Sequence, residues 1–206
     1  MTQGNVTLVR HSLVKSSFLE TIKILDGEIY NLEYHQVRYE RVLNSLGVSE
    51  YKKLEDFIEP PEWGLYRCRL LYDAQSIELE YHPYKKRDIS SFKLIFDNEI
   101  EYSQKSTERD SIELLFAQKE EADEVLIIKN LLVTDTSIAN VALFRNGSWL
   151  TPKEPLLKGT TRERLLDEGK IVEADIKANE LRSFSKIALL NAMIEFDIID
   201  EFEFLI

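Results

Sequence analysis

The chain reads Asp123-Glu-Val-Leu-Ile-Ile128, then Thr134-Asp-Thr-Ser-Ile-Ala-Asn140 and, further on, Leu157-Lys-Gly-Thr-Thr-Arg162. The first run has the apolar character of a short strand. The other two place carboxylate, amide and hydroxyl groups beside strands, where apolar packing would suffice. Two earlier segments share this property, His35-Gln-Val-Arg38 and Gln104-Lys-Ser106. We expect the chemistry of the protein to lie in these polar segments.

The first half of the chain has the pattern of a hairpin, a helix and a second hairpin. Residues 18–24 alternate and stop at Asp26-Gly27, a dipeptide typical of two-residue hairpin turns, and the chain returns over 28–32. Helical spacing follows, with apolar residues on one face and a glycine stop: Tyr39, Val42, Leu43, Leu46 and Gly47. Residues 64–73 and 77–81 are predicted to pair as strands.

A charged stretch with few apolar residues, 84–91, is the expected linker. It predicts two domains, residues 1–88 and 89–206. In the second domain we expect strand-like residues at 99–102, a helix over 106–119, and a helix over 160–167 that closes near Gly169. Further strands are expected at 92–96, 125–128, 140–144, 149–150, 170–176 and 187–190. The predicted class is α+β with mostly antiparallel sheets.

Composition and charge disfavour several classes of function. The 206 residues carry 26 Lys+Arg against 37 Asp+Glu, a formal charge of −11, which disfavours nucleic acid as a partner. One cysteine and three scattered histidines offer neither an intrachain disulfide nor metal-ligand spacing, so no metal is expected. No apolar run approaches 18 residues, and the N-terminus lacks an apolar signal core. We therefore expect a cytoplasmic protein with no membrane contact.

In order and spacing, the polar segments resemble those of class IV, fold-type IV pyridoxal-phosphate enzymes. This family includes branched-chain and D-amino-acid aminotransferases and aminodeoxychorismate lyase. The resemblance runs from Phe18 to Met193. It implies the D-amino-acid aminotransferase-like fold, with a small N-terminal α/β domain and a C-terminal pseudo-barrel α/β domain. It also implies pyridoxal 5′-phosphate in the cleft between them, a small amino substrate and a homodimer.

Two residues would carry the cofactor chemistry. Lys105 matches the lysine that joins the cofactor aldehyde, and a desolvated amine there can also move a proton. An isolated lysine is usually a solvated surface charge, so the family position decides this reading. Asp135 matches the carboxylate that keeps the pyridine nitrogen protonated, although many relatives have Glu at this position. Without the family, the segment around Asp135 could be a turn with side-chain to backbone bonds.

The resemblance assigns the phosphate and the ring to other segments. Arg38 matches the phosphate arginine, with His35 in a structural role beside it. Thr160 and Thr161 match the turn that holds the phosphate at a helix start. Without the resemblance, Arg38 would be interpreted as a solvated charge on a helix surface, and the two threonines as an ordinary helix N-cap. Leu157 would pack against the ring, and Ala192 belongs to a segment whose backbone closes the phosphate site.

Substrate contacts are expected from Arg69 and Arg109, which could reach a substrate carboxylate or the cofactor's phenolic oxygen. Solvated strand and helix faces explain these two residues equally well. If the protein is an aminodeoxychorismate lyase, Thr21 is expected to help protonate the enolpyruvyl group that leaves the substrate. The aromatic side chains Phe18, Tyr30, Tyr34 and Tyr39 exceed what a domain of about ninety residues easily buries, which favours a dimer.

Within the family, three features favour aminodeoxychorismate lyase, which converts 4-amino-4-deoxychorismate to 4-aminobenzoate and pyruvate on the folate route. The chain lacks a glycine-rich segment before Glu20-Thr21, the step from Lys105 to Arg109 is short, and Asn191-Ala resembles the lyase segment. These are analogies to a family. The alternatives are a class IV aminotransferase acting on a branched-chain or D-amino acid, and a non-catalytic paralogue of the fold.

Overall fold

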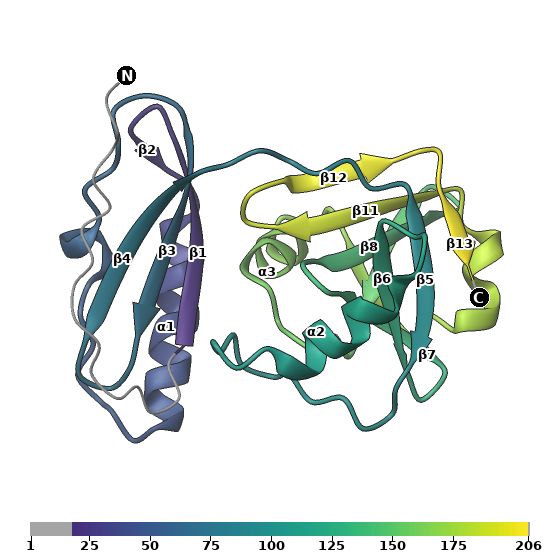
Figure 1. The fold of residues 1–206 in the computed structure, drawn as a ribbon, viewed down its shortest axis with the longest axis horizontal. Helices are drawn as coiled ribbons and strands as arrows, with labels where there is room; N and C mark the ends of the chain where they lie inside the picture. Colours follow the sequence, from purple (N-terminus) through teal and green to yellow (C-terminus); the bar gives the residue numbers. More distant parts are fainter. Residues whose placement is uncertain (1–17, 206) are drawn as a thin grey trace.

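A computed structural model describes residues 18–205, whose chain forms two β-sheets joined by an extended segment (Figure 1). The expectation of no apolar signal core concerns the N-terminus, which lies outside these residues. No helix in the described part of the chain is long and apolar enough to cross a membrane.

The first sheet is antiparallel, with strand order β2-β1-β3-β4. The elements of this half are β1 (Phe18–Leu25), β2 (Glu28–Ile29), α1 (Leu32–Ser45), the 3-10 helix η1 (Leu54–Phe57), β3 (Leu65–Tyr72) and β4 (Ile77–Pro83). Asp26 and Gly27 both have positive φ, at 49° and 83°, as a two-residue hairpin turn requires. The expected hairpin and helix are therefore present, but the return strand expected over 28–32 covers only 28–29 because α1 already begins at Leu32.

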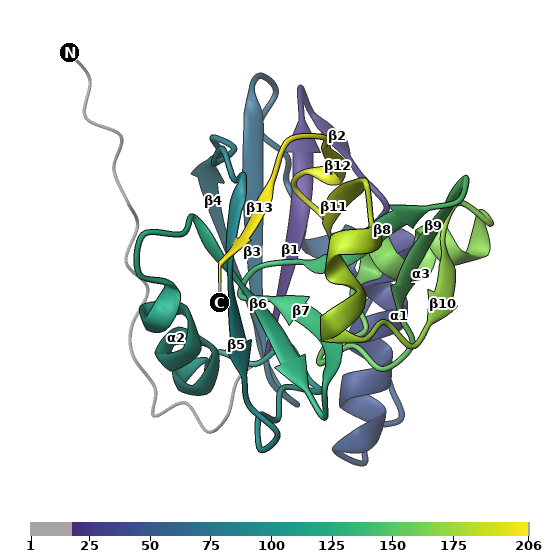
Figure 2. The same ribbon diagram turned by 90° about the vertical axis from the view of Figure 1, so that its right-hand side faces the viewer.

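The two faces of this sheet have different roles because successive side chains of a strand point to opposite sides. Ile22 and Cys68 are buried with Leu43 in a core between the sheet and α1. Thr21 and Arg67 belong to the alternate set on β1 and β3, and both line a cavity toward the second sheet. Figure 2 shows α1 on one side of β1 and β3.

The second sheet has strand order β10-β9-β8-β7-β6-β5-β13, with β11 paired to β8 and to β12. Its strands are β5 (Ser91–Phe96), β6 (Glu124–Lys129), β7 (Leu132–Thr136), β8 (Asn140–Arg145), β9 (Ser148–Pro152), β10 (Val172–Ala174), β11 (Lys186–Asn191), β12 (Glu195–Ile199) and β13 (Glu203–Leu205). Its helices are α2 (Asp110–Phe116), η2 (Ala117–Lys119), α3 (Thr160–Asp167) and η3 (Ala178–Ser183). Most strand pairs are antiparallel, while β5–β6, β5–β13 and β9–β10 are parallel.

Two sequence-based expectations before α2 are wrong. The helix expected over 106–119 begins at Asp110, because Ser106 pairs with Phe18 of β1 and the Leu19 amide donates to the Lys105 carbonyl at 2.9 Å. Residues 99–102 form no strand, because the Asp97 carboxylate accepts the amides of residues 99 and 100 and closes a turn.

The segment between the sheets has no regular structure, since β4 ends at Pro83 and β5 begins at Ser91. It crosses from one sheet to the other, as Figure 1 shows. We propose, as the sequence predicts, that the domains divide at residues 88 and 89.

Candidate active site

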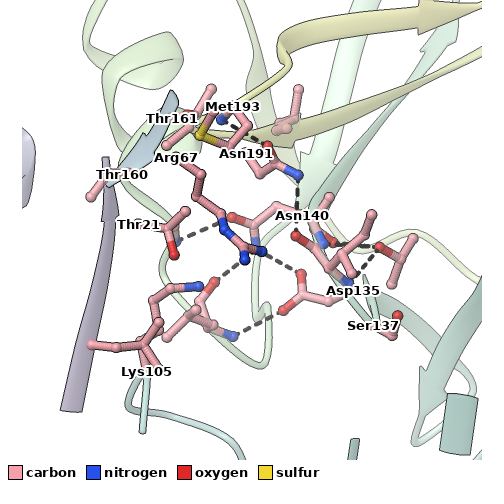
Figure 3. A pocket seen from close by; sticks show the side chains of 18 of the residues that line it. Thr21, Arg67, Lys105, Asp135, Ser137, Asn140, Thr160, Thr161, Asn191 and Met193 are labelled. Carbon is pink, nitrogen blue, oxygen red and sulfur yellow. Dashed lines mark hydrogen bonds between the residues drawn. The ribbon is translucent and has the colours of Figure 1, made fainter. Parts of the chain in front are cut away.

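A cavity of about 620 Å³ lies between the two sheets, within the volume range typical of sites for small molecules. All ten residues predicted for the site line it: Thr21, Arg38, Arg69, Lys105, Arg109, Asp135, Leu157, Thr160, Thr161 and Ala192. Figure 3 shows Thr21, Lys105, Asp135 and Thr160 around it. Residues more than a hundred positions apart are thus brought to one site.

Lys105 lies at the junction of the sheets. Its carbonyl accepts the Leu19 amide of β1, which fixes the backbone from which the side chain enters the cavity. Burial, followed by the positive charges of Arg38 and Arg109, lowers the pKa of the Lys105 amine to about 7. A large share of this amine is therefore neutral near pH 7, as a nucleophile or a base requires.

Asp135 is buried at the end of β7, opposite Asn140 of β8. Its Oδ1 accepts the Asn140 side-chain amide at 2.7 Å, and its Oδ2 accepts the Leu157 backbone amide at 2.9 Å. Burial raises the pKa of the Asp135 carboxyl to about 6, against the lowering effect of these two bonds. Each oxygen retains capacity for another donor in the cavity.

The turn that was the alternative for the segment around Asp135 begins only after that residue, which lies in β7, and the neighbouring Thr136 closes it. The Thr136 hydroxyl accepts the Ala139 amide at 3.0 Å and donates to the Ala139 carbonyl at 3.1 Å. The hydroxyl thus closes the turn between β7 and β8, and the carboxylate beside it faces the cavity.

Arg38 on α1 is held by a buried carboxylate, Glu20 of β1. Its Nε donates to Glu20 Oε1 at 2.8 Å and its Nη2 to Oε2 at 2.5 Å, while His35 Nδ1 lies 2.6 Å from the same Oε2. Burial would raise the pKa of Glu20, but Arg38 and His35 outweigh it and hold the pKa at about 2. Burial lowers the pKa of His35, so a neutral ring donating from Nδ1 fits this contact. The guanidinium is thereby oriented, with its remaining N–H groups available at the cavity wall.

The start of α3 also lies at the cavity, where Thr160 and Thr161 are buried and belong to the lining. Gly159 precedes this helix and provides no side-chain cap. The first amides of an uncapped helix attract an anion. Ala192 lines the same cavity, beside Asn191, whose side chain donates to the Ile138 carbonyl at 3.3 Å.

The two arginines expected at the substrate have partners within the protein. Arg69 pairs with Glu80 at 3.0 Å. Arg109 donates to the Tyr102 hydroxyl at 3.1 Å and to the Ser137 carbonyl at 2.8 Å. Arg67 also lines the cavity; it is exposed and has no hydrogen bond or ion pair with any of residues 18–205.

The cavity has a charge opposite to that of the whole chain. Among its described lining residues, Asp135 is the one acidic side chain, and the basic ones are Arg38, Arg67, Arg69, Lys85, Arg87, Lys105 and Arg109. A chain with a formal charge of −11 thus has a site suited to an anion.

A family model described as amino-transferase class IV matches residues 17–201. The chain belongs to the class IV aminotransferase family. The chain is similar in sequence to a protein of unassigned function from Haemophilus influenzae, with 42% identity over 84% of this chain and 96% of that protein.

Two further class IV relatives have provisional names. A Schizosaccharomyces pombe protein, provisionally named aminodeoxychorismate lyase, is 29% identical and aligns over 86% of each chain. A crystal structure from Haemophilus somnus 129pt, provisionally named 4-amino-4-deoxychorismate lyase, is 36% identical over 88% of this chain and 98% of that one, with a TM-score of 0.82. The mixed α/β structure is thus that of a fold-type IV enzyme, as the sequence predicts.

Class IV enzymes depend on pyridoxal 5′-phosphate, and the cavity fits its three functional parts. The uncapped start of α3 and the oriented guanidinium of Arg38 suit the phosphate. The buried carboxylate of Asp135 suits the ring nitrogen, and the amine of Lys105, with its lowered pKa, suits the aldehyde.

Three residues at the site were not assigned a role from the sequence. Glu20 is buried although it is a carboxylate in a strand, and its alternation with Ile22 places it on the side of α1. Arg67 shares its strand alternation with Arg69, a signal that could have identified it. Asn140 lies at the end of a motif that the sequence singled out, but its partners depend on chain segments that only the fold brings together.

Proposed function

We propose that this class IV protein is an aminodeoxychorismate lyase, which splits 4-amino-4-deoxychorismate into 4-aminobenzoate and pyruvate. The observation that carries the proposal is Arg67, an exposed cation that lines the cavity and has no protein partner among residues 18–205. A substrate with two carboxylates can use positive charge beyond that needed for the cofactor phosphate. A branched-chain amino acid carries a single carboxylate and has less use for this additional positive charge. The provisional names of two relatives support the same reaction.

When bound, pyridoxal phosphate supplies an electron-accepting ring that stabilises negative charge at the substrate carbon. The Lys105 amine removes the proton from the amine-bearing carbon, for which its lowered pKa suits it. Asp135 would hold the proton at the ring nitrogen. Arg38, with the backbone of Thr160 and Thr161, would hold the phosphate, since all of them line the cavity.

The remaining steps concern the leaving group. The bond from the substrate ring to the enolpyruvyl oxygen breaks, and the ring becomes aromatic as 4-aminobenzoate. Thr21 lines the cavity and donates a proton to the departing enolpyruvate, which becomes pyruvate. Arg67 binds a substrate carboxylate. Arg69 and Arg109 are further contacts, but each must share its guanidinium with its present protein partner or give up that hydrogen bond.

The test is an assay of the purified protein with pyridoxal phosphate and 4-amino-4-deoxychorismate. We expect equal amounts of 4-aminobenzoate and pyruvate. In parallel, glutamate or D-alanine is offered with a keto acid. Rapid amino-group exchange with no 4-aminobenzoate would reject the lyase in favour of an aminotransferase. No binding of the cofactor and no turnover would favour the non-catalytic alternative.

A further inference from the structure

Asn140 is a buried amide whose hydrogen-bonding groups are all used. Its Nδ2 donates to Asp135 Oδ1 and to the Leu157 carbonyl, each at 2.7 Å, and its Oδ1 accepts the Gly159 amide at 3.1 Å. Figure 3 shows Asn140 beside Asp135 within the cavity. One side chain therefore joins β7 to the segment that precedes α3.

The three partners of Asn140 lie at different parts of the proposed cofactor site. All three line the cavity: Asp135 would face the ring nitrogen of the cofactor, Leu157 would lie at its ring, and Gly159 precedes the start of α3 that would bind the phosphate. Because both ends of the site bond to one amide, a change in its position would move the carboxylate and the phosphate turn together. This part of the argument rests on the proposed function.

Gly159 is explained by the same amide. Its φ of −76° and ψ of 144° are open to any residue, so the backbone conformation does not require glycine. A Cβ at this position would lie 2.1 Å from Asn140 Oδ1 and 3.2 Å from its Cγ. Glycine is needed here because the amide of Asn140 occupies the space of a side chain.

We propose that Asn140 is a positioning residue that fixes the ring-nitrogen carboxylate of Asp135 and the phosphate turn as one unit, and that Gly159 lacks a side chain to admit it. The amide also tunes the carboxylate, because its donated bond favours the ionised form of Asp135 and counters the effect of burial on its pKa. An ionised carboxylate is the form that holds a proton on a ring nitrogen.

The test is a double-mutant cycle with Asn140→Ala, Gly159→Ala and both together. It measures the dissociation constant of pyridoxal phosphate and the urea denaturation midpoint without cofactor. Gly159→Ala should lower the midpoint and weaken cofactor binding by about tenfold or more, equivalent to about 1.4 kcal/mol. In the Asn140→Ala background, where Oδ1 is absent, the same change should weaken binding by less than about twofold. Equal effects of Gly159→Ala in the two backgrounds would overturn the proposal.

A second variant separates hydrogen-bond donation from volume. Asn140→Asp keeps the shape but loses both donors and places a second carboxylate beside Asp135. It should weaken cofactor binding and shift the pH at which the absorbance of the bound cofactor changes. An unchanged affinity and pH profile would show that donation by Asn140 has no such role.

Thr151→Val is the matched control. The buried Thr151 hydroxyl donates to the Val141 carbonyl at 2.8 Å on the neighbouring strand and is not among the cavity's lining residues. It should lower the denaturation midpoint and leave the cofactor affinity unchanged. If Thr151→Val weakens binding as much as Asn140→Ala, loss of stability explains the effect and the positioning role fails. Failure of the wild type to bind pyridoxal phosphate would reject the proposed function, while the midpoints would still test the coupling of Asn140 and Gly159.

Discussion

Lys105 lies where burial and nearby guanidinium groups oppose its positive charge. The same surroundings that make the ammonium form costly keep the amine reactive near neutral pH. Lys129, by contrast, pairs with the exposed Glu101 and donates to the Ile100 carbonyl.

Competitive labelling with acetic anhydride should distinguish Lys105 from ordinary lysines in the protein without cofactor. Because only the neutral amine reacts and the pKa of Lys105 is about 7, its labelling should reach half its maximum near pH 7. Ordinary lysines reach this point near pH 10.4. Peptide mass spectrometry across pH 5 to 11 measures each site. A midpoint above pH 9 for Lys105 would contradict the lowered pKa.

Glu20 should contribute to stability in a pH-dependent way. Its pKa is about 2 in the folded protein against a reference of 4.5, so its contribution is present above pH 4.5 and is lost as the pH falls toward 2. Glu20→Gln should lower the free energy of unfolding at pH 7 by about 3 kcal/mol, because it leaves Arg38 buried without its partner. The loss should be much smaller at pH 2.5. Urea unfolding at both pH values measures this.

The control for Glu20 is Glu101→Gln, which removes an exposed partner of Lys129 and should have a much smaller effect at pH 7. Equal losses in the two variants, or a loss for Glu20→Gln that does not depend on pH, would refute the role of the buried pair.

At the scale of elements, strand alternation explains how β1 and β3 contact the helix α1 on one face and the cavity on the other. One set of side chains packs against α1, and the other includes Thr21, Arg67 and Arg69 at the cavity. The period-2 pattern and the Asp26-Gly27 turn are local, so these strands could be predicted from the sequence.

The start of α2 could not be predicted in this way. Helical spacing continues back toward Ser106, but that residue pairs with β1 across a sequence separation of 88 residues. β7 was likewise not identified as a strand, because polar residues such as Thr134 and Asp135 interrupt its apolar pattern. The partners of Asn140 are a further case, since no local period records a bond between β8 and the segment before α3. The residue types of the site could be predicted from family motifs, and their bonds could not.

The substitution Arg67→Ala tests whether the side chains of β3 that line the cavity bind the substrate. It should raise the KM for 4-amino-4-deoxychorismate by roughly tenfold or more, since a hydrogen bond to a charged group contributes about 1.5–3 kcal/mol. The value of kcat and the affinity for pyridoxal phosphate should change less.

Lys23→Ala is the matched control for Arg67, because Lys23 is its cross-strand neighbour on β1 and is not among the lining residues. It removes the same charge outside the cavity. An unchanged KM for Arg67→Ala, or an equal rise in both variants, would exclude Arg67 as a substrate contact.

At the scale of the whole molecule, the cavity depends on both sheets, so the relative placement of the two halves is part of the site. The carboxylate of Asp123 accepts the amides of Ser90 and Ser91 at 2.9 and 3.0 Å, and Arg87 pairs with the buried Glu124 at 2.7 Å. These contacts hold the end of the connecting segment against the second sheet.

We propose a homodimer, as the family resemblance implies. Of the four aromatic residues expected to favour a dimer, Phe18 and Tyr39 are buried within the single chain, so only the partly exposed Tyr30 and Tyr34 could be covered by a partner. Light scattering should give twice the chain mass of 24.1 kDa. A particle of the single-chain mass at working concentration would reject the dimer.

The central claim is that the cavity holds pyridoxal phosphate on Lys105. Borohydride reduction of the protein mixed with the cofactor, followed by peptide mass spectrometry, tests it directly. We expect the mass of the reduced cofactor on the peptide that contains Lys105, and no such adduct at this site in Lys105→Ala. An adduct on another lysine in place of Lys105, or no adduct in the wild type, would contradict the account.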